Sequence, residues 1–264
     1  MTDALGLARQ LGLSDKALVS FMGRARRVSA LCGDAGKLAA GLAPRDGADG
    51  QVTVFMPNCP LALVAMLAAL SAGYSPRLLD PRAALKDLRP QFAAIENRDL
   101  VLTVDLSAVQ DRLLAVLPQD SRPRVAVGRF ATQMPMPQRI LAPYLRGGTF
   151  SRLPQHESFF RLEGLMGKTS ATASALSRES DIVVSSGSCS LAALLEEAGE
   201  QARTRKGQRW LLDQPLGRRD SLVASLAAMR KGAELILAPR LDEESLKKTM
   251  ASTKADLRAP GTRG

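Results

Sequence analysis

The stretch with the clearest chemical potential is Ser-Ser-Gly-Ser-Cys-Ser, at positions 185–190. It follows the β-branched run 182–184 and precedes apolar residues spaced as on a helix, at Leu191, Leu194, Leu195 and Ala198. A strand, a small-residue loop and a helix start form an arrangement in which backbone N–H groups and hydroxyls bind phosphate. The candidate binding residues are therefore Ser185, Ser186, Gly187, Ser188 and Ser190.

A helix cap explains the same residues equally simply. The hydroxyl of Ser188 or Ser190 could accept a hydrogen bond from a free N–H group in the first helical turn. A P-loop of the Walker type also needs a lysine directly after its second glycine. Gly187 stands alone here, and the next lysine is Lys206. The residues by themselves leave both interpretations open.

Other reactive side chains indicate no second site. His156 is the single histidine, so neither a metal site nor a histidine-dependent triad is supported. The acidic pairs at 196–197 and 243–244 are adjacent on expected helices, where their members point in different directions. We therefore expect no catalytic residue, no metal and no cofactor.

Cysteine usage and the N-terminal residues favour the cytoplasm. Cys32, Cys59 and Cys189 are far apart and odd in number, which fits reduced thiols better than a disulfide framework. The first residues lack the basic and apolar regions of a secretory signal. The longest apolar run, 61–70, is too short to span a bilayer.

The positive net charge favours anionic partners, but it does not distinguish nucleic acid from acidic membranes, acidic proteins or nucleotides. Lys and Arg total 36 against 26 Asp and Glu, a formal net charge of +10. The aromatic fraction of 4% supplies few stacking platforms for single-stranded nucleic acid. A membrane surface is a further alternative to an ordinary solvated loop or helix, because arginines and apolar residues mix at Arg139, Ile140, Leu141, Leu145, Arg146 and Arg152.

The order of expected elements predicts an α/β fold. Apolar strands within 51–58, 75–81, 99–105, 122–128, 181–184, 209–214 and 233–239 alternate with helical segments, which favours a doubly wound, mostly parallel sheet flanked by helices. Residues 1–50 are interpreted as helical. The helix 61–72 is apolar on all sides and should be buried, with Asn58 as its cap. A helix over 82–95 is expected to break near Pro90.

Four regions follow from this pattern. We predict a first α/β subdomain over 1–128, an irregular insertion or linker over 129–180 and a second α/β segment with a degenerate phosphate loop over 181–250. A capped helix over 241–250 ends the second segment. Residues 251–264 are expected to be a frayed polar tail.

The motifs in this order resemble the N-terminal part of the adenylate-forming (AMP-binding) superfamily, especially bacterial long-chain fatty acyl-CoA synthetases. The resemblance rests first on "GQVTVFMPNCPLALVAMLAALSAGYSPRLLDP" at 50–81. "MPMPQRILAPYLRGG" resembles an insertion of those synthetases, and "DIVVSSGSCS" lies where the family has its phosphate loop. "GQRWLLDQPLGRRDSLVASLAAMRKGAELILAP" resembles the strand-helix-strand that follows.

Departures from the family pattern argue against unassisted acyl adenylation. The family's phosphate loop continues through a Thr-Gly-x-x-Lys-Gly segment, whereas Ser190 runs directly into Leu191. Where the family often has Pro-Leu-Phe-His along its acyl tunnel, this chain has Pro-Leu-Gly-Arg at 215–218. The 264 residues also end before the positions of the family's adenine-binding, magnesium-binding and ribose-binding motifs and its C-terminal catalytic lysine.

The favoured expectation is thus a degenerate, truncated relative of acyl-CoA synthetases that is more a binding, scaffold or regulatory protein than an enzyme. Its partner would be a larger enzyme, an acyl carrier protein or a second copy, in acyl or lipid metabolism. One alternative is residual nucleotide or acyl binding that completes a ligase site with another chain. The others are a basic protein that binds nucleic acid or acidic membrane, and a gene product without a selected function.

Overall fold

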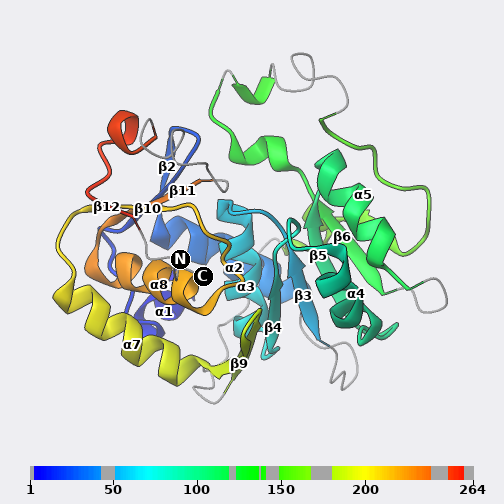
Figure 1. The fold of residues 1–264 in the computed structure, drawn as a ribbon, viewed down its shortest axis with the longest axis horizontal. Coiled ribbons are helices and arrows are strands. Elements are labelled where there is room, and N and C mark those ends of the chain that lie inside the picture. Colours follow the sequence, from blue (N-terminus) through cyan, green and yellow to red (C-terminus); the bar gives the residue numbers. More distant parts are fainter. Residues whose placement is uncertain are drawn as a thin grey trace.

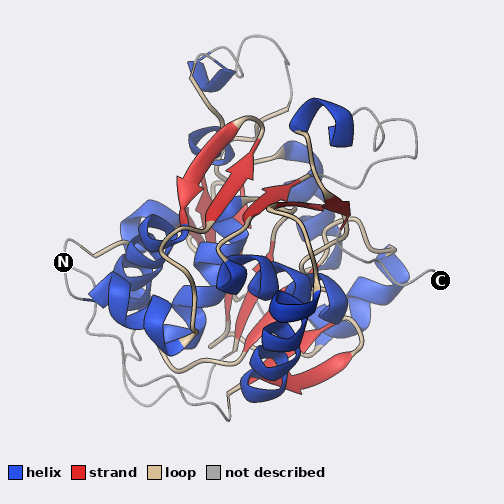
Figure 2. Cartoon of the chain, turned by 90° about the vertical axis from the view of Figure 1, so that its left-hand side faces the viewer, coloured by secondary structure: helices blue, strands red, loops and turns tan. Residues whose placement is uncertain are grey.

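The computed structural model describes residues 3–42, 51–118, 123–136, 138–140, 149–167, 180–238 and 249–258 (Figure 1). Its strands form two sheets, with helices between them and on their outer sides (Figures 1 and 2). No helix within these ranges is both long and apolar enough to cross a bilayer.

The larger sheet has seven described strands in the order β7-β6-β5-β3-β4-β8-β9. Every pair is parallel except β8 with β9, which confirms the predicted doubly wound, mostly parallel sheet. Strands buried on both faces are nearly continuous apolar runs, as in Val52–Phe55. The strands are β3 Val52–Phe55, β4 Pro76–Leu79, β5 Leu100–Val104, β6 Arg124–Gly128, β7 Phe159–Arg161, β8 Asp181–Val184 and β9 Gly187–Ser190.

The smaller sheet joins the two ends of the sequence. Five described strands lie in the order β12-β10-β11-β1-β2. They are β1 Leu18–Phe21, β2 Arg24–Arg27, β10 Arg209–Leu212, β11 Glu234–Leu237 and β12 Leu257–Arg258. The prediction that residues 1–50 are helical is therefore wrong for the β1–β2 hairpin. The reason is that β1 is fixed by its parallel pairing with β11, which is remote in sequence, and not by a local pattern.

Seven longer helices complete the described fold: α1 Asp3–Gln10, α2 Val28–Leu42, α3 Pro60–Ser71, α4 Leu85–Ala93, α5 Ser107–Val116, α7 Leu191–Thr204 and α8 Arg219–Lys231. All of α3 is buried, as its apolar sequence predicts. It contacts β1 of the smaller sheet and both β3 and β4 of the larger one. The helix thus lies between the sheets and forms the centre of the core (Figure 1).

Asn58 joins the sheets instead of capping α3. The residue at the cap position is Cys59, which makes no side-chain hydrogen bond to the helix. The Asn58 amide donates to the carbonyl oxygens of Gln214 and Ala238, at 2.7 and 3.2 Å. Its carbonyl oxygen accepts from the backbone N–H of Leu216, at 3.0 Å. These buried tertiary partners outcompete the local cap that the sequence suggests.

Pro90 does not break α4, contrary to the expectation. The helix runs from Leu85 to Ala93 with Pro90 inside it. Proline removes only one N–H group, and the carbonyl that this group would bind belongs to Lys86, which is exposed and has access to water. A short helix with one missing bond is tolerated here because Leu88 and Phe92 are buried in the core.

The predicted regional divisions contain more regular structure than expected. Two 3-10 turns, η1 Phe130–Gln133 and η2 Leu162–Leu165, and the strand β7 lie within the stretch interpreted as irregular, 129–180. β12 lies in the stretch predicted to be a frayed tail, because its backbone pairs with β10. The helix predicted over 241–250 lies mostly outside the described residues. The four divisions themselves remain predictions.

Candidate functional site at the β8–β9 hairpin

The predicted phosphate loop is mostly a strand. β8 and β9 pair antiparallel in a register that sets Val184 opposite Gly187 and Asp181 opposite Ser190. Only Ser185 and Ser186 remain as a two-residue turn. Gly187, at φ +121, supplies a backbone conformation that other residues rarely adopt. A hairpin thus replaces the expected open loop at three of the five candidate residues, Gly187, Ser188 and Ser190.

Ser190 is the cap of α7. Its hydroxyl accepts a hydrogen bond from the backbone N–H of Ala193, at 3.3 Å. The following apolar residues, Leu191, Leu194, Leu195 and Ala198, are all buried, as their spacing predicts. The sequence allowed Ser188 or Ser190 as the helix cap, and the structure assigns the cap to Ser190. Ser188 is an exposed residue of strand β9.

The hairpin turn is tied to the loop that joins β10 to α8. The Ser185 backbone N–H donates to the carbonyl oxygen of Gly217, at 2.8 Å. Gly217 itself passes so close to β4 that a Cβ atom would lie 2.6 Å from the carbonyl oxygen of Leu78. Asn58 holds the same loop through Gln214 and Leu216. The turn is therefore part of a hydrogen-bonded junction between the sheets.

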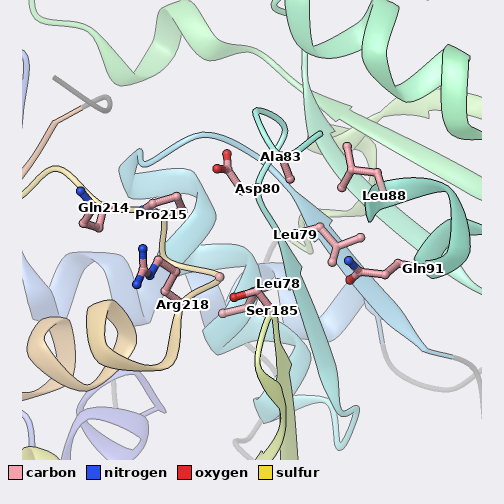
Figure 3. Close-up of a pocket in the computed structure, with 11 residues that line it drawn as sticks. Leu78, Leu79, Asp80, Ala83, Leu88, Gln91, Ser185, Gln214, Pro215 and Arg218 are labelled. Atoms are coloured by element: carbon pink, nitrogen blue, oxygen red, sulfur yellow. The ribbon is translucent and has the colours of Figure 1, made fainter. Parts of the chain in front are cut away.

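A small hollow lies at this junction, at the carboxyl end of β4, where ligands bind in open α/β sheets (Figure 3). Its volume is about 190 Å³. Figure 3 shows Arg218, Pro215 and Gln214 on one side and Leu88 and Gln91 on the other. The full lining is Leu78, Leu79, Asp80, Ala83, Leu88, Gln91, Ser185, Gln214, Pro215, Gly217 and Arg218.

A second, more open hollow of about 420 Å³ adjoins the first. It is lined by Ser185, Ser186, Arg218, Arg219 and Asp220, and so lies at the N-terminus of α8. A helix N-terminus with hydroxyls and guanidinium groups attracts anions. The Arg219 guanidinium, however, already pairs with the carboxylate of Glu197 at 3.0 Å.

Carboxylates reduce the positive charge available at both hollows. Asp80 lines the first, and its Oδ1 atom accepts from the backbone N–H of Arg82 at 2.9 Å. Asp220 lines the second. A triphosphate would meet these negative charges without a lysine to offset them, since no lysine among the described residues lines either hollow. The arrangement suits a small polar or singly charged group better than a nucleotide.

The three cysteines and the histidine take part in packing and local hydrogen bonds. All three cysteines are free, and burial raises the pKa of Cys32 and of Cys59 to about 12, so neither thiol is a nucleophile near neutral pH. Burial also raises the pKa of Cys189. His156 contacts the Ser158 hydroxyl through Nδ1, at 2.6 Å. Among the described residues no group of His, Cys, Asp and Glu is arranged to hold a metal ion.

Sequence reasoning missed most of the lining. Of the five predicted residues, only Ser185 and Ser186 line the hollows. Asn58 and Gly217 organise the junction although neither was a candidate. The carboxyl ends of parallel strands meet at one edge of a sheet, where ligands often bind. The residues that follow two strands, Asp80 after β4 and Pro-Leu-Gly-Arg after β10, could therefore have indicated the lining from the sequence.

Solved structures share this fold, although their sequences are distant. The amide bond synthetase McbA from Marinactinospora thermotolerans matches with a TM-score of 0.65 at 17% identity, over 97% of this chain and 48% of that one. A Rhodopseudomonas palustris protein assigned as a long-chain-fatty-acid CoA ligase matches with a TM-score of 0.69 at 15% identity, over 98% and 63%. The Mycobacterium tuberculosis fatty acyl CoA synthetase matches with a TM-score of 0.65 at 13% identity, over 97% of this chain and 48% of that one.

The resemblance to adenylate-forming ligases is thus confirmed at the level of the fold. The chain spans about half to two thirds of the length of these neighbours, 48% of one and 63% of another. No known protein family matches the sequence itself. No curated protein matches it either.

Proposed function

We propose that this chain is a non-catalytic acyl-CoA synthetase-like protein that acts as a binding, scaffold or regulatory partner in acyl or lipid metabolism. The single observation that carries the proposal is the β8–β9 hairpin, which turns at Ser185-Ser186 and continues directly into α7. At the position where related ligases are expected to hold phosphate, this chain makes a strand pair and a helix cap.

The environment of the hairpin supports the proposal. The cavity between β4 and the β10–α8 loop, about 190 Å³, is smaller than typical small-molecule sites of about 300–1,000 Å³, and the larger hollow beside it is open to solvent. The guanidinium group of Arg219 is already paired with Glu197, and Asp80 and Asp220 add negative charge. Preorganised positive charge is usually the largest contribution to phosphoryl and adenylyl transfer. The framework around α3, in contrast, keeps every residue of that helix buried.

Exchange of radiolabelled pyrophosphate into ATP tests the absence of adenylation. The full chain is incubated with ATP, Mg²⁺ and, in turn, octanoate, dodecanoate and hexadecanoate, with an active acyl-CoA synthetase as the positive control. We expect no carboxylate-dependent label in ATP. Carboxylate-dependent exchange that persists through repeated purification would overturn the proposal.

A binding experiment tests the partner role separately. The immobilised chain is exposed to purified acyl-CoA synthetases and acyl carrier protein from its own cell at physiological salt. We expect a saturable complex with one of them and a change in the rate of acyl activation when the chain is added to that enzyme. If none of these proteins binds, the partner role is wrong even where the exchange experiment is negative.

Residual anion binding is a second candidate, favoured by the position of Ser185, Ser186 and Arg218 at the N-terminus of α8. Calorimetry with Mg·ATP, acyl-AMP and acyl-CoA tests it, with Arg218→Glu as the matched variant. Heat that Arg218→Glu abolishes would support this candidate. Absence of heat with all three ligands would eliminate it.

A further inference from the structure

Large apolar side chains are exposed at four described positions. The exposed fractions are 44% for Met22, 52% for Leu114, 64% for Met136 and 55% for Ile140. Leu114 lies on α5. Met22, Met136 and Ile140 belong to two segments that lie side by side, the β1–β2 hairpin and the residues around η1.

Two contacts join those segments. The rings of Phe21 and Phe130 pack edge to face, with centroids 5.7 Å apart. The Arg24 guanidinium donates to the carbonyl oxygen of Thr132 at 2.7 Å. In Figure 1 the β2 strand and the green segment that follows β6 both lie toward the upper side of the molecule. The β1–β2 hairpin and the segment around η1 therefore lie on the same side of the molecule.

Met136 and Ile140 are on one side of a helical turn. The backbone N–H of Arg139 donates to the carbonyl oxygen of Pro135 at 2.9 Å, a bond between residues four apart. Side chains four apart on such a turn are neighbours. Both are more than half exposed, so the turn presents a pair of apolar side chains to the surroundings.

Met22 is exposed at a position that disfavours methionine. It and Gly23 form the tip of the β1–β2 hairpin, with φ of +51 and +85. Two successive positive φ values fit a type I′ turn, where Asn-Gly is preferred and a side chain such as methionine is strained. Turn geometry does not account for this side chain, and strain of this kind accompanies function in many proteins.

Three arginines lie in the same two segments as the three apolar side chains. Arg129 precedes Phe130 directly, Arg24 is in β2 and Arg139 is in the helical turn. None of the three forms an ion pair within the part of the chain that the structure describes. We call these six residues the apolar–basic patch: Met22, Arg24, Arg129, Met136, Arg139 and Ile140.

We propose that the apolar–basic patch binds the surface of a membrane that contains anionic lipid. Apolar side chains that enter the boundary between headgroups and acyl chains, flanked by arginines that pair with lipid phosphates, are the features by which proteins bind such surfaces. Nucleic acid would bind the arginines through its phosphates. It would make no favourable contact with Met22, Met136 and Ile140, which neither stack on bases nor hydrogen-bond to them.

The proposal narrows the membrane alternative that the sequence raised. Arg139 and Ile140 lie in the patch, and both are exposed. Leu141, Leu145 and Arg146 lie outside the described residues. The hairpin tip, 114 residues before Met136 by number, could not be associated with this segment from the sequence.

Sedimentation with lipid vesicles tests the proposal. The full chain is mixed with vesicles of phosphatidylcholine alone, and with vesicles containing equal parts of phosphatidylcholine and phosphatidylglycerol. We expect binding to the anionic vesicles only. The variant that combines Met22→Ser, Met136→Ser and Ile140→Ser should bind anionic vesicles at least about tenfold more weakly. Arg139→Gln should bind them about fivefold more weakly.

Leu114→Ser is the matched control, because it removes the fourth exposed apolar side chain outside the patch and should leave vesicle binding unchanged. Circular dichroism and thermal unfolding confirm that each variant is folded. The proposal is overturned by failure to bind anionic vesicles, by equal binding of the triple variant, or by an equal loss in Leu114→Ser. Binding to a DNA duplex without binding to vesicles would assign the arginines to nucleic acid and overturn it too.

Discussion

Two hairpins of this protein have the same local design and opposite surroundings. β1–β2 lies at one edge of the smaller sheet and β8–β9 at one edge of the larger, and each continues directly into a helix. The turn of β8–β9 is bound to the Gly217 carbonyl through the Ser185 N–H group. The turn of β1–β2 carries an exposed methionine, Met22, in a strained conformation.

The difference shows where to look for function in a fold that this chain shares with solved ligase structures. The hairpin with the suggestive sequence is hydrogen-bonded into the framework, through the Ser185 N–H group and the Ser190 hydroxyl. The hairpin with an unremarkable sequence, Phe-Met-Gly-Arg at its tip, exposes an apolar side chain next to basic residues. Variants that affect one hairpin and not the other separate these roles.

Asn58→Ala should have the largest effect on stability. It removes three hydrogen bonds to buried backbone groups and leaves those groups without partners. We expect a loss of about 3 kcal/mol or more in the free energy of unfolding. Urea denaturation measures it, and Asn97→Ala, at an exposed position, is the control. Amide exchange at Ser185 should accelerate while the β1–β2 hairpin is unchanged; an equal effect on both hairpins contradicts the comparison.

Gly217→Ala tests the close approach of the loop to β4. The added Cβ would lie 2.6 Å from the Leu78 carbonyl oxygen, so the loop must move. We expect a loss of about 2 kcal/mol. Gly6→Ala is matched to it because the new Cβ meets nothing within 4 Å inside helix α1, and it should gain about 0.5 kcal/mol. Equal stability of the two variants would show that the loop is not closely packed on β4.

Ser190→Ala should cost about 1 kcal/mol, because it removes the side-chain cap of α7. Ser188→Ala is the natural comparison, since it changes an exposed strand residue of the same hairpin, and we expect an effect within about 0.5 kcal/mol. Thermal unfolding measured by circular dichroism distinguishes them. A larger loss in Ser188→Ala would mean that the capping assignment is wrong.

Met22→Asn should change stability least and in the opposite direction. Asparagine before Gly23 suits the positive φ of this turn, so we expect a gain of about 0.5 kcal/mol in the free energy of unfolding. Vesicle binding should weaken in the same variant. A gain in stability together with weaker binding separates a functional methionine from a structural one; a loss of stability would indicate that Met22 packs against the fold.

The framework was predictable because its signals are local. The continuous apolar residues of 60–71 indicate a buried helix, and β3, β5 and β6 are short apolar runs between helical patterns. The same local signals exist at Leu191, Leu194 and Leu195, where the helix face was predicted correctly. Such patterns predict the structure well because burying the apolar face directly stabilises the helix or strand that carries it.

The junction was not predictable because its determinants are tertiary. Asn58 has an ordinary capping position in sequence, but its hydrogen bonds go to residues more than 150 positions away. β9, Gly-Ser-Cys-Ser, has little intrinsic strand preference and is set by its pairing with β8. The proximity of Phe21 to Phe130, and thus the apolar–basic patch, likewise depends on how the two sheets pack.

Amide NMR of the isotope-labelled full chain, with and without Mg·ATP, tests the central claim most directly. The claim is that residues 185–190 form a closed hairpin and cap, not a phosphate loop. The account predicts that the Ser185 amide exchanges slowly with solvent and that no amide from 185 to 190 shifts as Mg·ATP is added. A saturable shift of these amides, with the Ser185 amide released, would contradict it.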